Sequence, residues 1–570
     1  MLRNVLDDYL ERVKEREFDL PLLLLLPVLG YYDVHLTHGP VEFGRDVIAK
    51  RREGDNEVQF SFQSKAGDIT QSAWRNEIRG QIETALWSSL SHPNFNRNLP
   101  HQVVLLTTGD LKGNAAIEFQ EFNDTIKDRY QRRPVIFWSK LKLIELLLEH
   151  GLNGIYRATA AGFGEFGRFF ELYSRALQRV ITVRDIEVYS RQWTSAAVDR
   201  ERRLLLSAVE AEVLAQCCLE GDLVYEAAQL HLARLRLLCE FSYGENGEEL
   251  RKLWDRGIER LYALCASYVD QISETWIVER DLVKTWFGEV YMTTYPVQCA
   301  RIMEMASLAY FSAPGGEDKE RHAAFIRRFV RAEPGCTHPI SDRFAISIVL
   351  VSLVLIDWKL LDDVAQLLEK ATVWICDRYE DGMGLPGVEA DEQAETNRLL
   401  GYPFDFIPVP RRHDSLLATA VMDLSAFLGN ADLFRDIVND IKACRIHAEY
   451  WQPSDTIGAC RIEGRDILHF PSVGFADALD EENKDYAEHI ASDSGSFRFV
   501  ELFGPESAVV VMALLRDRYF PALWQQIASN HQMGSHSTAT PNQERKDVGD
   551  YIQLAGDHED AKEIKDQLNP

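Results

Sequence analysis

Three side chains in the first part of this 570-residue chain have the types and the spacing to do chemistry together. Asp46 precedes an apolar run, and Gln63 and Lys65 lie at the end of the next one. Carboxylate and amide oxygens bind hard divalent cations, and a neighbouring ammonium helps to deprotonate and orient an attacking water. Asp46, Gln63 and Lys65 therefore match the parts that metal-dependent cleavage of a phosphodiester requires.

A β-hairpin is needed to bring these three residues together. Side chains alternate between the two faces of a strand, so Gln63 and Lys65 share a polar face and the intervening Val and Phe residues point the other way. Residues 54–56 read Gly-Asp-Asn, which favours a hairpin turn. We therefore expect residues 46–50 to fold back against the second strand, with Asp46 alongside its Gln-x-Lys end.

A helix is expected after the hairpin, at residues 71–90, because apolar side chains recur there at helical spacing. Glu77 and Gln81 are four residues apart and border the apolar stripe, so we expect them to lean toward the polar strand face. Arg75 and Arg79 are also four apart and lie on the other flank of the helix.

This arrangement resembles the restriction-endonuclease-like PD-(D/E)xK superfamily and, within it, the Mrr-like branch, whose pattern is a Gly-x-Asp, a strand and then Gln-x-Lys. The resemblance covers about residues 1–155. The positions that carry it are His38, Gly39, Glu42, Phe43, Gly44, Arg45, Asp46, Gln63, Ser64, Lys65, Ala66, Gly67, Asp68 and Gln81.

The resemblance implies an α/β domain with a mixed sheet flanked by helices, acting as a metal-dependent DNA endonuclease. It further implies that Asp46 binds Mg²⁺ or Mn²⁺, that Gln63 is a second ligand or its neighbour, and that Lys65 serves catalysis. Supporting positions are Glu42, Glu77, Gln81 and Glu17, the last only because it lies in the preceding helical segment.

The chain departs from the family pattern at Gln63, where Asp or Glu is usual. An amide oxygen ligates a hard cation without adding charge, so metal affinity is expected to depend on the bound phosphate or on a further acid such as Glu42 or Glu17. Two other interpretations stay open. A Gln and a Lys on a strand face are often only solvated surface, and the domain can be a copy of the fold that does not cleave.

Charge is distributed unevenly along the chain. Residues 1–155 carry 19 basic and 22 acidic side chains, out of 62 and 89 in the whole chain, so most of the net charge of −27 belongs to residues 156–570. A strongly acidic surface repels nucleic acid, which argues against the larger part as a DNA-binding platform. The candidates for DNA contacts lie in the first part and are Arg45, Lys50, Arg51, Arg75 and Arg79.

Composition predicts several further units after the first domain. An Ala- and Gly-rich linker is expected at residues 156–168, a large mainly α-helical region at 169–530, and a polar, disordered tail at 531–570. Successive helices with short turns suggest antiparallel hairpins, and a solenoid is one way to stack them. The odd number of cysteines and the absence of a convincing signal or membrane-spanning segment indicate a cytoplasmic protein.

We expect the helical region to regulate the first domain, to oligomerise, or to bind a protein partner such as an ATPase or a sensor. Restriction-like nucleases joined to large helical regions are often effectors of prokaryotic defence against phage and plasmid DNA, which the resemblance alone suggests. The alternatives are a stand-alone restriction enzyme that reads a sequence or a modification, and a scaffold or binding protein with an inactive nuclease fold.

Overall fold

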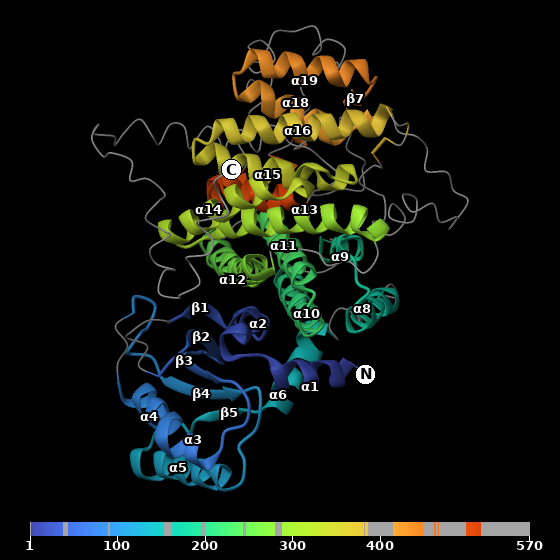
Figure 1. Cartoon of the computed structure of the whole chain (residues 1–570). Helices are drawn as coiled ribbons and strands as arrows, with labels where there is room; N and C mark the ends of the chain where they lie inside the picture. The colour runs from blue at the N-terminus through green and yellow to red at the C-terminus, as the bar shows by residue number, and fades with distance from the viewer. Residues whose placement is uncertain are drawn as a thin grey trace, which may run out of the picture.

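The chain has two parts, a mixed five-stranded sheet flanked by helices and a mostly helical region that follows it (Figure 1). The computed structural model describes residues 2–37, 44–88, 92–152, 162–194, 200–242, 247–279, 288–380, 382, 384–385, 414–448, 461–462, 465–466 and 498–514.

The sheet has the spatial order β1-β2-β3-β4-β5. Its first two pairings are antiparallel and its last two are parallel. The expected hairpin is confirmed, because β2 and β3 pair from Val47 opposite Phe62 to Glu53 opposite Asn56, and Gly54 turns the chain with a φ of +61°. The strands are β1 (Tyr32–Leu36), β2 (Val47–Glu53), β3 (Asn56–Lys65), β4 (His101–Thr107) and β5 (Ile136–Trp138).

Each face of the sheet is covered by a different set of helices. One face, here called the α2 face, packs Phe60 and Phe62 against the leucine-rich helix α2, in which Leu22 and Leu25 are fully buried. The other face, here called the α4 face, packs against an apolar cluster that includes Trp74. The covering helices are α1 (Leu2–Arg12) and α2 (Glu15–Val28) on the first, and α3 (Gln71–Ala73), η1 (Trp74–Ile78), α4 (Arg79–Trp87) and α5 (Asn114–Tyr130) on the second.

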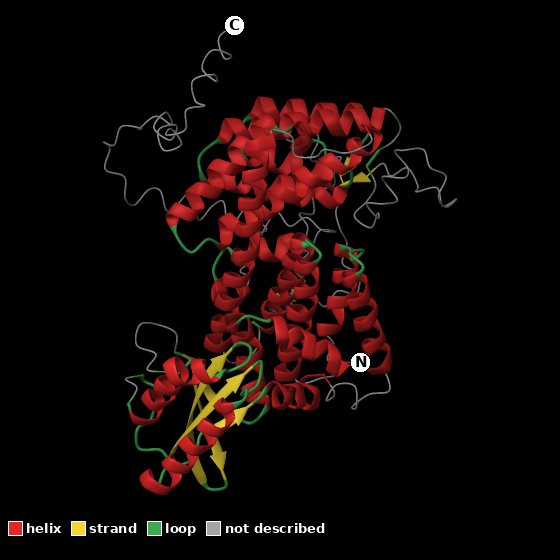
Figure 2. Cartoon of the chain, turned by 60° about the horizontal axis from the view of Figure 1, so that its bottom comes forward, coloured by secondary structure: helices red, strands yellow, loops and turns green. Residues whose placement is uncertain are grey.

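The helical region extends away from the sheet in successive layers, from α12 through α13, α15, α16 and α18 to α19 (Figures 1 and 2). Helix α15 lies inside the stack, with twelve of its thirteen residues buried. The helices are α6 (Lys140–Leu146), α8 (Gly162–Leu177), α9 (Val183–Ser190), α10 (Arg200–Glu220), α11 (Val224–Phe241), α12 (Gly247–Glu279), α13 (Gly288–Ser312), α14 (Gly316–Ala332), α15 (Ala345–Asp357), α16 (Leu361–Glu380), α18 (Leu416–Phe427), α19 (Ala431–Ala443), α22 (Arg498–Phe503) and α23 (Ser507–Leu514).

The short elements of the described chain complete this architecture. They are the π-helical turn η2 (Leu147–Leu152), the 3₁₀ turns η3 (Arg191–Thr194), η4 (Pro334–Thr337) and η5 (Asp342–Phe344), and the two-residue strands β6 (Asp414–Ser415), β7 (His447–Ala448), β8 (Arg461–Ile462) and β9 (Arg465–Asp466). Most of them connect or end helices, so the second part of the chain has little sheet among its described residues.

The two parts share one continuous apolar core, because α2 packs between the sheet and α10. Polar contacts cross the same boundary: Glu17 accepts a hydrogen bond from Arg260 at 3.0 Å, and the Lys252 ammonium lies 3.1 Å from Nδ1 of His35. The expected linker at 156–168 overlaps helix α8, which begins at Gly162, while residues 153–161 lie outside the described part.

Three further expectations concern membrane spans, the cysteines and the tail of the chain. No helix in the described ranges is long and apolar enough to cross a membrane. The eight cysteines of the described chain are all free thiols. The tail predicted at 531–570 lies outside the described residues.

Candidate functional site

The backbone of the hairpin holds Asp46 against the end of β3. The Asp46 amide donates to the Phe62 carbonyl at 2.8 Å, and Oδ2 of Asp46 accepts a hydrogen bond from the Ser64 amide at 2.6 Å. Ser64 stands between Gln63 and Lys65 in the chain, so the carboxylate lies beside the Gln-x-Lys segment, as the hairpin predicted. Asp46 is buried, with 5% of its surface exposed.

The polar row on β3 is also where strand alternation puts it. Gln59 and Ser61 have structural partners: the Gln59 amide nitrogen donates to the Ala49 carbonyl at 2.9 Å, and the Ser61 hydroxyl lies 2.8 Å from Nε2 of His101. Gln63 is equally enclosed, at 3% exposure, but its Oε1 atom is buried and has no hydrogen-bond partner among the described residues. Gln63 is therefore the member of this row with an unused acceptor.

Lys65, at the end of β3, and Glu77, in η1, lie close together. The helical spacing predicted that Glu77 leans toward the polar face of the strand. The Lys65 ammonium lies 3.4 Å from Oε1 of Glu77, and the lysine side chain is only 13% exposed. Glu77 lies in the π-helical turn η1, which interrupts the helix between α3 and α4. Single π-helical turns inside α-helices often occur at functional sites.

Helix α4 approaches the Gly-x-Asp segment at Gln81. Gly44 has a φ of +69°, and a Cβ atom there would lie 2.1 Å from the Gln81 carbonyl oxygen, so only glycine fits both the conformation and the space. The Oε1 atom of Gln81 is buried without a hydrogen-bond partner, like that of Gln63. The structure thus gathers Asp46, Gln63, Lys65, Glu77 and Gln81 where β2 begins, β3 ends and α4 crosses.

The donor atoms fit a hard cation held partly by its substrate. Among the described residues there is no group of three His, Cys, Asp or Glu side chains that could hold a metal ion. Asp46 supplies one carboxylate, and the Gln63 amide oxygen is an unpaired neutral donor. Mg²⁺ commonly binds through one or two carboxylates together with substrate phosphates and water, so one carboxylate and one amide oxygen are the kinds of ligand that this mode uses. Glu42 lies outside the described residues.

Two expected site residues have other roles. Arg45, proposed as a DNA contact, is fully buried; its Nη2 donates to the Ala85 carbonyl at 2.6 Å and to the Ser88 carbonyl. Burial lowers the pKa of Arg45 to about 10. Glu17, proposed as a further acid, lies on α2 against the opposite face of the sheet and pairs with Arg260 at 3.0 Å. The spacing of residues along the sequence predicts neither the contacts of Arg45 nor the pairing of Glu17 with Arg260.

The remaining basic candidates differ in their positions. Arg51 is on the α2 face, with its guanidinium over the rings of Tyr31 and Phe60. Lys50 pairs with Asp33 at 2.5 Å. Arg75, in η1, and Arg79, the first residue of α4, have side chains that are 60% and 52% exposed, and they pair with Glu118 and Glu83.

Sequence reasoning did not assign the turn that follows Lys65 to the site. Thr108 Oγ1 accepts a hydrogen bond from the Gly67 amide at 2.9 Å, and the Thr107 hydroxyl donates to the Gly67 carbonyl. A Cβ atom on Gly109 would lie 2.3 Å from the Gly67 carbonyl carbon. The end of β4 thus fixes the chain directly after Lys65, and the signal for it was the Thr-Thr-Gly at a strand end.

Comparisons with known proteins give no assignment: no family model matches the chain, and neither the curated proteins nor the solved structures contain a match.

Proposed function

We propose that this protein is a metal-dependent DNA endonuclease with a restriction-endonuclease-like N-terminal domain and a site formed by Asp46, Gln63 and Lys65. The observation that carries the proposal is the buried Oε1 atom of Gln63, which has no hydrogen-bond partner among the described residues. In the same strand segment, the Ser64 amide donates to the Asp46 carboxylate, and Lys65 ends the strand. Mg²⁺ or Mn²⁺, when bound, supplies charge stabilisation at the scissile phosphate and a more acidic water.

The energetics favour a ligand role for Gln63. A buried acceptor without a partner costs about 1–3 kcal/mol, and most such atoms in folded proteins are paired. Gln59 and Ser61, on the same strand face, do have hydrogen-bond partners. The unpaired acceptor of Gln63 is therefore an exception on this face of β3. A cation or a polar substrate group at Gln63 offsets the cost.

The residues of the chain have separate tasks in this proposal. Asp46 is oriented by the Ser64 amide and supplies the charged ligand. Lys65 carries its ammonium in a largely enclosed position, where Glu77 holds it by a 3.4 Å contact, and it orients or deprotonates the attacking water. Gly44 brings α4 close enough to complete the enclosure.

The helical region is proposed to control this site. It carries most of the negative charge, and α10 packs directly on α2, which in turn covers the back of the catalytic sheet. Self-association or a protein partner acting on the helices would therefore reach β3 through α2. A solenoid-like stack and an effector role in prokaryotic defence complete the proposal and rest on the helix order and the family resemblance respectively.

Cleavage of plasmid and linear duplex DNA with Mg²⁺ or Mn²⁺ tests the proposal. We expect Asp46→Ala and Lys65→Ala each to lower the rate by at least about 100-fold, the lower end for loss of a general acid or base. Ser61→Ala is the matched control, since Ser61 shares the strand face and its hydroxyl contacts His101. Thermal unfolding of all three variants verifies that they are folded.

The same assay separates the alternatives. Near wild-type cleavage by both variants would show that the site is assigned wrongly. Site-selective cutting by the purified wild-type chain alone would favour the stand-alone restriction enzyme. A folded wild-type chain that binds its partner but cleaves no DNA under any metal would favour the inactive scaffold.

A further inference from the structure

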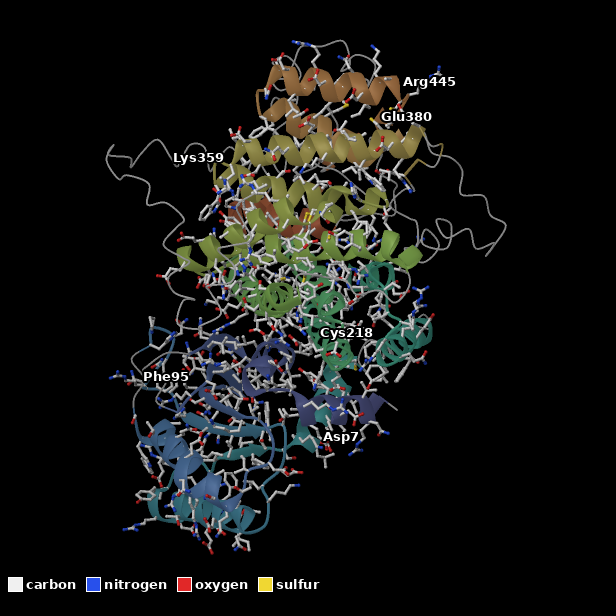
Figure 3. All side chains as sticks on the ribbon, in the orientation of Figure 1. Asp7, Phe95, Cys218, Lys359, Glu380 and Arg445 are labelled. Carbon is white, nitrogen blue, oxygen red and sulfur yellow. The ribbon has the colours of Figure 1, made fainter. Side chains whose placement is uncertain are left out.

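A polar loop joins α4 to β4 on the same side of the sheet as the candidate site. Its described part, residues 92–100, borders an open hollow of about 770 Å³. Figure 3 shows Phe95, at the middle of this loop, on the outer side of the α/β part. The hollow is lined by Lys50, His92, Pro93, Phe95, Asn96, Arg97 and Asn98.

The loop is fastened to the sheet by side-chain and backbone hydrogen bonds. Asn94 Nδ2 donates to Oδ1 of Asp33 at 2.6 Å, and the Asn96 amide donates to Oε1 of Gln59 at 3.2 Å. Within the loop, the Asn98 amide donates to Oδ1 of Asn96 at 3.0 Å. These contacts hold the loop in one shape before any ligand arrives, so binding loses little conformational entropy.

Arg45 connects this loop to the candidate site. Its backbone immediately precedes Asp46, and its buried guanidinium lies over the ring of Phe95, 5.2 Å from the centroid. Phe95 in turn meets His101 edge to face, at the start of β4. One arginine side chain therefore spans the distance between the proposed metal ligand and the loop, and both lie over the same face of the sheet.

The loop presents groups that suit nucleic acid. Asn96, Arg97 and Asn98 are exposed, and none of the described residues that line the hollow is acidic, although the chain has a net charge of −27. Arg97 has no hydrogen bond or ion pair within the described part of the chain. Arginine makes bidentate hydrogen bonds to guanine, and asparagine to adenine, so these side chains have the chemistry to read base edges.

We propose that the 92–100 loop contacts double-stranded DNA beside the cut and reads its bases through Arg97 and Asn98. This inference rests on the proposed nuclease function. It adds a source of sequence preference outside the candidate metal site, on a loop whose position is fixed by Arg45, Gln59 and Asp33.

Binding and cutting are measured separately to test the loop. Binding of fluorescent duplexes is followed by anisotropy in the Asp46→Ala background, where no product forms, and cut positions in randomised DNA are sequenced in the otherwise wild-type chain. We expect Arg97→Ala and Asn98→Ala each to weaken binding to preferred sequences by roughly 5- to 150-fold, and to broaden the cut-site preference. Arg435→Ala, which removes an exposed arginine on distant α19, is the control for net charge.

The outcomes are distinct. Unchanged binding and unchanged cut positions in both loop variants would overturn the inference. An equal loss of binding for every sequence, with a weaker salt dependence, would mean contact with phosphates only and would also overturn base reading. Loop variants that behave as expected, combined with full cleavage by Lys65→Ala, would uphold the loop and reject the proposed catalytic site.

Discussion

Buried polar residues in the two parts of the molecule can be compared by how their oxygens are paired. In the helical region, Glu304 is completely buried on α13, and each of its oxygens accepts a hydrogen bond, from the Tyr225 hydroxyl at 2.8 Å and from the Gln229 amide at 3.0 Å. In the α/β part, the buried oxygens of Gln63 and Gln81 have no partner in the described structure. The Glu304 carboxylate is therefore fully paired, whereas these two amide oxygens are not.

The residues also differ in their position in the fold. Helical packing fixes Glu304 inside the stack, so its partners must come from neighbouring helices. Gln63 lies two residues before the end of β3. Buried polar atoms without a partner in the described structure also occur in the helical region, for example at Gln229, His231 and His322, so an unpaired atom alone does not mark a binding site. Burial and the nearby Arg260 and Arg234 hold the pKa of His231 well below the usual range, so it is neutral.

The largest effect on stability is expected from breaking the satisfied pair of bonds. Glu304→Leu removes the acceptor of both Tyr225 and Gln229, so we expect the free energy of unfolding to fall by roughly 2–6 kcal/mol. Urea unfolding followed by tryptophan fluorescence measures it. Glu320→Leu, at an exposed position on α14, is the control and should change stability by less than about 0.5 kcal/mol. Equal stabilities would mean that the Glu304 contacts contribute nothing.

A somewhat smaller effect is expected on the rate of DNA cleavage, from a change at the contact between Gly44 and helix α4. Gly44→Ala forces α4 away from the Gly-x-Asp segment, and a displacement of about 1 Å lowers rates by about 100-fold. Gly54→Ala is the matched control, because Gly54 has a similar positive φ but open space around it. If both variants cleave DNA equally, the approach of α4 to Gly44 does not position the site.

Gln63→Leu is expected to reverse the usual cost of a core substitution. Because it removes an unpaired acceptor, the free energy of unfolding should stay the same or rise by up to about 1–3 kcal/mol, while metal-dependent cleavage is lost. Gln59→Leu is the matched control: Gln59 is equally buried, but it bonds to Ala49 and Asn96, so stability should fall. Thermal unfolding and cleavage assays on both variants test the contrast, and a destabilised, active Gln63→Leu would contradict it.

The smallest effect concerns pH. Burial lowers the pKa of His101 to about 3. The unfolded chain binds its proton below about pH 6.5 and the folded chain does not, so stability falls as pH decreases from 6.5 toward 3. The slope from this group approaches about 1.4 kcal/mol per pH unit. His101→Gln should flatten the dependence of the unfolding free energy between pH 7 and 5. An unchanged slope would show that His101 does not carry it.

Much of the α/β part followed from local patterns. Alternation along β3, the Gly-Asp-Asn turn and the stripe on residues 71–90 predicted the hairpin, the polar row and the approach of Glu77 to that row, where the structure pairs it with Lys65. Strand β1 was not predicted, because it is only five residues long and begins with Tyr-Asp, where Asp33 has a φ of +53°. Short strands of this kind depend on their neighbours for stability.

The sequence by itself determined which side chains share a strand face or a helix flank, because those periodicities are properties of a single element. Only the tertiary structure decided which residues of that set have partners. The guanidinium of Arg45 is buried over the ring of Phe95, and Glu17 pairs with Arg260 across the shared core. In the polar row of β3, Gln63 has an oxygen without a partner among the described residues. Burial and pairing depend on what packs against an element from distant parts of the chain, and the local spacing of residues does not predict that.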